Sequence, residues 1–150
     1  HHMKGNIDAA ITDYREAQRL NPTEPFDALM LYIALGEVGR MEEAKEGLSR
    51  LLKRWPTTEW PSPLAMHLLG QNSQADLKKA AQTGTEVLRK YQDFDWHFYL
   101  GAQAMLQGDA KKARTYFEYV VDTNMRQFLE YNLARVFLER LGGRAYMKTG

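Results

Sequence analysis

Residues 5–22 carry a single apolar stripe at helical spacing. Apolar side chains recur every three or four positions, at Ile7, Ala10, Ile11, Tyr14, Ala17 and Leu20. Charged residues fill the positions between them. Pro22 has no amide hydrogen and restricts the residue before it, so the helix is predicted to end there. The small Ala10 and Ala17 favour close approach of a second helix, and a larger side chain there would cost about 1–3 kcal/mol.

The same pattern returns further along the chain. A glycine, an alanine and a proline, namely Gly5, Ala10 and Pro22, recur 34 positions later as Gly39, Ala44 and Pro56. This interval is the length of a tetratricopeptide repeat (TPR), a unit of two helices joined by a turn. The chain therefore resembles a TPR protein. The resemblance implies an all-α fold, a right-handed TPR-like superhelix of stacked helix pairs.

The second unit contains two predicted helices. The first covers residues 25–38, with Glu24 or Thr23 as its cap and Pro25 in the first turn, where its missing N–H costs nothing. The second covers residues 42–54. The following segment, WPTTEWPSP at residues 55–63, contains three prolines and cannot be helical throughout.

The third unit is degenerate but keeps the same period. Ser62 is expected to cap a short helix over residues 63–69. Ser73 and Asp76 form a capping box that is expected to open a helix running to about Lys90. Gly84 would weaken that helix by about 1 kcal/mol relative to alanine, so this region is predicted to be the least stable part of the chain.

The fourth unit, at residues 93–124, returns to the repeat pattern. Gly101 is expected to allow close helix packing, and Gly108 is expected to turn the chain. A last amphipathic helix is predicted over residues 126–141, ended by Gly142 and Gly143. We expect this helix to cap the open face of the solenoid, with a dimer contact as the alternative.

These units define the expected domain organisation. A single TPR-like domain is expected over residues 4–150, with a partial repeat at 4–22, a repeat at 23–56, a degenerate repeat at 57–92, a repeat at 93–124 and a capping helix at 126–141. Residues 1–3 resemble the remnant of a purification tag. The first repeat lacks its leading helix, so we expect that helix either to have been trimmed away or to come from another copy of the chain.

The composition argues against several classes of function. The 20 basic and 19 acidic residues are interleaved and give a net charge of +1, without the dense basic face that nucleic-acid binding needs. No apolar run approaches the roughly 20 residues of a membrane span. The chain has no cysteine, and only His67 and His97 lie outside the tag remnant, so no metal or other cofactor is expected. No nucleophile with a neighbouring base stands out, and we therefore expect no enzyme.

A narrower resemblance rests on the order of these segments. The Trp-Pro linker, the short segment LAMHLLGQNS, the sequence HFYLGAQAMLQGDAKKARTYFEYVV and the final NMRQFLEYNLARVFL are similar to the NlpI lipoproteins of bacteria. The resemblance implies an adaptor for periplasmic proteases and cell-wall hydrolases at the outer membrane. It implies a periplasmic location, whereas a TPR protein outside this family would be cytoplasmic. The chain departs from the NlpI pattern in having no lipobox cysteine and no complete first repeat.

The TPR resemblance also implies a concave inner surface that binds a partner. Carried over by repeat phase, its positions are Phe26, Leu29, Ile33, Glu37, Trp60, His67, Asp95, Phe98, Ala102 and Met105. This lining is mostly apolar and aromatic, and lacks the Lys, Asn and Arg of repeats that bind a C-terminal carboxylate. We expect a protein or peptide partner with apolar anchors, with Phe26, Trp60 and Phe98 as candidate hot spots.

Each of these aromatic residues also has a structural interpretation. Phe98 could belong to the core, and Trp60 could pack on the turn beside it. The favoured function is a non-enzymatic scaffold or adaptor. The alternative is a structural module that forms a homodimer or larger homo-oligomer, in which another copy completes the first repeat.

Overall fold

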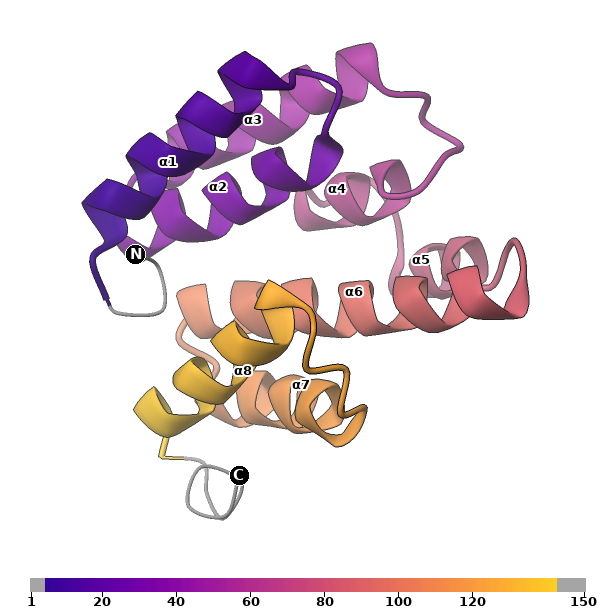
Figure 1. Ribbon diagram of the computed structural model, residues 1–150. Coiled ribbons are helices and arrows are strands. Elements are labelled where there is room, and N and C mark those ends of the chain that lie inside the picture. Colours follow the sequence, from indigo (N-terminus) through magenta and orange to yellow (C-terminus); the bar gives the residue numbers. More distant parts are fainter. Residues whose placement is uncertain (1–4, 143–150) are drawn as a thin grey trace. The chain divides into compact units, whose positions relative to one another are not determined.

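The computed structural model describes residues 5–142, which fold into eight α-helices and no strand (Figure 1). The predicted all-α class is confirmed. The helices are α1 (Ile7–Leu20), α2 (Pro25–Glu37), α3 (Met41–Arg54), α4 (Ser62–Leu68), α5 (Gln74–Ala81), α6 (Glu86–Leu106), α7 (Ala110–Asp122) and α8 (Leu129–Arg140). The predicted tag remnant at residues 1–3 and the predicted stop at Gly143 lie outside the described residues.

The described residues form two compact units, unit 1 up to Gln92 and unit 2 from Asp93 onwards. The division falls inside α6.

Unit 1 is organised around α2. This helix is apolar almost all round, and every residue from 28 to 35 is buried. It begins with Pro25 after Glu24, whose carboxylate accepts the Phe26 N–H at 3.0 Å. Short connections at residues 21–24 and 38–40 make α1 and α3 antiparallel to α2, and both pack against it (Figure 1). Helices α1 and α3 therefore run in the same direction.

Three helices share one local design. Each begins two residues after a glycine whose φ lies in the left-handed region; the glycines are Gly5 (80°), Gly39 (80°) and Gly108 (82°), before α1, α3 and α7. Five residues after each glycine is an alanine no more than 2% exposed: Ala10, Ala44 and Ala113. Glycine adopts this backbone conformation without steric cost, and a buried alanine leaves room for a neighbouring helix.

The helix predicted from Ser73 to about Lys90 is wrong, because α5 ends at Ala81 and α6 begins only at Glu86. Gly84, with φ of 92°, lies in the turn between them. The side-chain amide of Gln92 donates to the carbonyl oxygens of Ala81 and Thr83, each at 2.9 Å. These two hydrogen bonds hold the turn against α6. The chain therefore turns at Gly84 instead of continuing as one helix.

The predicted cap of α4 is also wrong. Pro61 occupies the N-cap position, and Ser62 is the first helical residue, with its hydroxyl buried and without a hydrogen-bond partner. The capping box of α5 is present as predicted, with the Ser73 hydroxyl accepting the Asp76 N–H at 3.0 Å. Helix α4 packs against both α3 and α5.

Unit 2 is built on an aromatic core. The rings of Phe98 on α6, Phe117 on α7 and Phe137 on α8 are all fully buried, with centroids 5.5–6.5 Å apart. Gly101 lies directly against Phe117, and a Cβ atom there would come within 2.9 Å of the ring. The close packing predicted at Gly101 is therefore present. Helix α8 starts at Leu129, three residues later than the predicted capping helix at 126–141.

Candidate functional site

The expected inner-surface residues of unit 1 differ in exposure. Leu29 and Ile33 are completely buried on α2. The other four, Phe26, Glu37, Trp60 and His67, are partly exposed. Within unit 1, these four are therefore the expected residues that present side-chain surface to a partner.

The remaining expected positions lie in unit 2. Phe98 and Ala102 are completely buried, while Asp95 and Met105 are partly exposed. The Phe98 ring packs against Tyr99 at 4.9 Å as well as against Phe117 and Phe137. Phe98 is thus a core residue, which agrees with its structural interpretation.

Trp60 and His67 also have structural contacts. The backbone oxygen of Trp60 accepts a hydrogen bond from the Trp55 indole at 3.2 Å. The Nδ1 atom of His67 lies 3.0 Å from the Asn72 side-chain oxygen, and the Asn72 amide donates to the Pro63 carbonyl. Trp60 therefore helps to hold the α3–α4 connection, and His67 helps to hold the α4–α5 connection.

A groove that the sequence did not reveal lies in unit 1. Residues of α1 and α3 line it together with Leu31 and Leu35 of α2, and its volume is about 460 Å³. Its charged lining consists of Arg15, Arg19, Glu43, Glu46, Arg50 and Arg54. We call it the arginine groove, because four guanidinium groups face two carboxylates.

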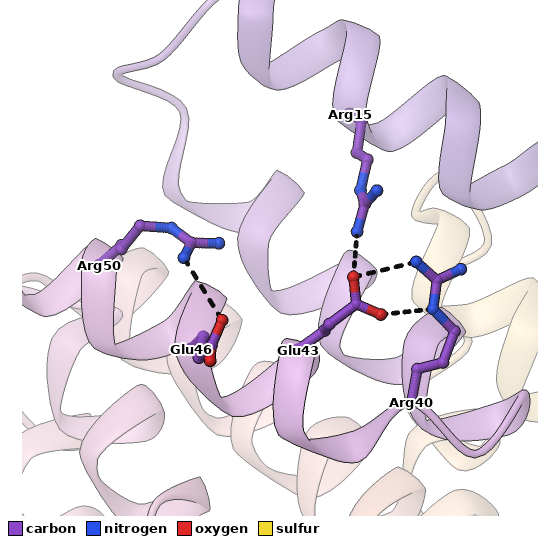
Figure 2. Close-up of polar contacts among 5 residues, drawn as sticks. All are labelled: Arg15, Arg40, Glu43, Glu46 and Arg50. Atoms are coloured by element: carbon purple, nitrogen blue, oxygen red, sulfur yellow. Dashed lines mark hydrogen bonds and ion pairs between the residues drawn. The ribbon is translucent and has the colours of Figure 1, made fainter.

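Glu43 is the central carboxylate of the arginine groove (Figure 2). Its oxygens accept hydrogen bonds from Arg40 at 2.5 and 3.0 Å and from Arg15 of α1 at 3.1 Å. The bonds from Arg40, and then those from Arg15, lower the pKa of Glu43 to about 2. The carboxylate therefore stays ionised at any physiological pH and links α1 to α3.

At the other end of the groove, carboxylates balance less of the positive charge of the arginines. Arg50 lies 3.9 Å from Glu46, and the side chains are 64% and 70% exposed, so this ion pair is weak (Figure 2). Arg54 has no ion pair within residues 5–142. Positive charge is therefore in excess along the part of α3 that carries these two arginines.

Unit 2 contains an aromatic and polar cluster beside its core. The His97 ring stacks between Trp96 at 3.8 Å and Tyr119 at 3.7 Å. The Tyr119 hydroxyl donates to the Asp93 carboxylate, and burial, followed by this hydrogen bond, raises the pKa of Tyr119 to about 12. Rings in direct stacking contact leave no space for a ligand between them, so this cluster is a packing feature.

Glu130 on α8 is a partly exposed carboxylate of unit 2 whose pKa is shifted. Burial raises its pKa, against the opposing effect of hydrogen bonds from its own backbone N–H and from the Tyr99 hydroxyl at 3.3 Å. Tyr99 is completely buried, so the pair joins α6 to α8 inside the unit.

No known protein-family model matches this chain. Across residues 5–142, no three or more His, Asp or Glu side chains are grouped so as to hold a metal ion. In the same stretch, every helix is too short or too polar to cross a membrane.

Proposed function

We propose that this chain is a non-enzymatic scaffold for protein interactions, built as a TPR-like superhelix of helix pairs. The observation that carries the proposal is the shared design of α1, α3 and α7, each opened by a left-handed glycine and each with a buried alanine five residues later. The first two copies are one TPR period apart. Recurrent helices of this kind bury one face against their neighbours and leave extended surfaces for a partner.

The partner is expected to be a protein or peptide with apolar anchors. Phe26 and Trp60 are the aromatic positions of the predicted inner surface that retain exposed area. Aromatic side chains bury a large area on binding and often dominate the affinity. In its narrowest form the proposal is an NlpI-like adaptor in a bacterial cell-envelope complex, which rests on the resemblance of the sequence.

A homo-oligomerisation module is the second candidate. It is favoured by Leu20, which is 69% exposed at the end of α1 and is the most exposed large apolar residue among residues 5–142. Sedimentation equilibrium distinguishes the candidates. A monomer mass at every concentration would exclude the oligomerisation module, and a dimer that dissociates in a Leu20→Glu variant would support it.

Affinity capture tests the scaffold proposal. The immobilised protein is expected to retain a reproducible set of proteins from a bacterial envelope extract, identified by mass spectrometry. The double variant Phe26→Ala with Trp60→Ala should lose most of that set, because it removes both partly exposed aromatic anchors.

The matched control is Val87→Ala with Tyr91→Ala. These exposed side chains on α6 are outside the predicted inner surface, so this variant should retain the same proteins as the wild type. Circular dichroism should show native helix content for both variants. Equal capture by the wild type and both variants would refute the predicted binding surface, and no capture by the wild type would count against the scaffold itself.

A further inference from the structure

We infer that the arginine groove binds an acidic polypeptide segment. The inference goes beyond the proposed function, because no residue lining this groove belongs to the predicted inner surface. It assigns a second interaction surface to unit 1. The partner is recognised by carboxylates together with apolar side chains.

Both sides of the groove carry arginine side chains. Helices α1 and α3 both pack on α2 and run in the same direction, and Arg15 of α1 lies 3.1 Å from Glu43 of α3. Arg19 follows Arg15 about one turn further along α1, and Arg50 and Arg54 follow Glu43 about two and three turns further along α3; all three arginines line the same groove. A segment lying along the groove would therefore meet guanidinium groups from both helices.

The base of the groove is apolar and open. Leu31 and Leu35 of α2 contribute to its lining. Gly47 on α3 lies between the two glutamates and Arg50, and an added Cβ atom there would meet nothing within 4 Å. The missing side chain leaves space in the middle of the groove for an apolar side chain of the partner.

The arginines are available to a ligand. The pairs Arg19–Glu16 and Arg50–Glu46 join side chains that are each more than half exposed, and such pairs contribute little to stability. A carboxylate of the partner can therefore replace Glu16 beside Arg19, or Glu46 beside Arg50, at little cost in free energy. Arg54 needs no exchange, since it has no ion pair within the described residues.

The lining favours a polypeptide over a nucleic acid. Glu43 and Glu46 lie among the arginines and would repel a continuous row of phosphates. The lining also contains no aromatic ring on which a base could stack. Separate carboxylates can instead be placed against individual guanidinium groups, which bind them through two parallel hydrogen bonds.

Fluorescence anisotropy with a synthetic probe tests this inference. The probe is a fluorescein-labelled peptide in which single glutamates are separated by leucine and serine residues, titrated with the whole chain at low salt. The wild type is expected to bind the probe. The double variant Arg50→Gln with Arg54→Gln should weaken binding about tenfold or more, through the loss of two charge-assisted contacts.

The control is Lys45→Gln with Lys53→Gln. It removes the same charge from the same helix, but neither lysine lines the groove. Binding by this variant should stay within about twofold of the wild type, since exposed charges outside the contact are largely screened. Because the probe is synthetic, the result does not depend on the outcome of affinity capture.

Three results would overturn the inference. The first is a wild-type chain that does not bind the probe. The second is an equal loss of binding in both double variants, which would indicate bulk charge rather than a groove. The third is a single-stranded oligonucleotide of matched charge that binds as tightly as the peptide with the same sensitivity to Arg50 and Arg54, which would identify a general polyanion site.

Discussion

Replacing Phe98 with alanine is expected to lower the free energy of unfolding of unit 2 by about 3–5 kcal/mol. The side chain is completely buried, and its ring packs against the rings of Tyr99, Phe117 and Phe137. Truncation removes these contacts and leaves a cavity that a closely packed interior cannot fully close.

The measurement uses the single tryptophan of unit 2. The chain has three tryptophans, and in a background with Trp55→Phe and Trp60→Phe only Trp96 remains to report urea unfolding. Met105→Ala is the control, because Met105 is also on α6 but is partly exposed and should lose much less stability. A loss below about 1 kcal/mol for Phe98→Ala would contradict its place in the core.

This result bears on the interpretation of binding experiments. Phe98 is a candidate hot spot by repeat phase, but any loss of binding in Phe98→Ala would be explained by the unfolding of unit 2. Variants of the partly exposed Phe26 and Trp60 are the informative ones.

Alanine substitution should have opposite effects at two helical glycines. At Gly101 a Cβ atom would lie 2.9 Å from the Phe117 ring and 3.0 Å from the Tyr116 Cβ atom. The overpacking should cost about 1–3 kcal/mol, partly offset by about 1 kcal/mol from the better helix propensity of alanine. At Gly47 a Cβ atom meets nothing within 4 Å, so only a gain of about 0.5–1 kcal/mol is expected.

Thermal unfolding followed by circular dichroism compares the two changes. Gly101→Ala should lower the melting temperature and Gly47→Ala should raise it slightly, while Gly101→Val should lower it further than Gly101→Ala. A Gly101→Val variant as stable as the wild type would show that α6 and α7 are not in the close contact described here.

Much of the fold could be predicted from local sequence. Apolar residues at helical spacing located α1, α2 and α3 within a few residues, since proline and glycine mark where these helices start or stop. The prediction failed where two signals competed. The apolar pattern predicts a continuous helix through Gly84, but the chain forms a turn there. Gln92 stabilises this turn by donating hydrogen bonds to the carbonyls of Ala81 and Thr83, and Gln92 itself lies beyond the turn.

The functional surfaces were less accessible to prediction. Repeat phase assigns Leu29, Ile33, Phe98 and Ala102 to a surface, but it carries no information on how deeply each side chain is packed. The arginine groove depends on the register of α1 against α3. Arg15 and Glu43 are 28 positions apart, and in the sequence each has the spacing of an ordinary solvent-facing charge. Their pairing becomes visible only once the helices are packed.

The most direct test of the repeated helix design is to replace each of its buried alanines with leucine. Ala10→Leu, Ala44→Leu and Ala113→Leu should each lower the free energy of urea unfolding by about 1–3 kcal/mol, because equivalent positions face equally close neighbours. If any of the three tolerated leucine with a change within about 0.5 kcal/mol, that helix would not be a copy of the others, and the case for a TPR-like scaffold would fail.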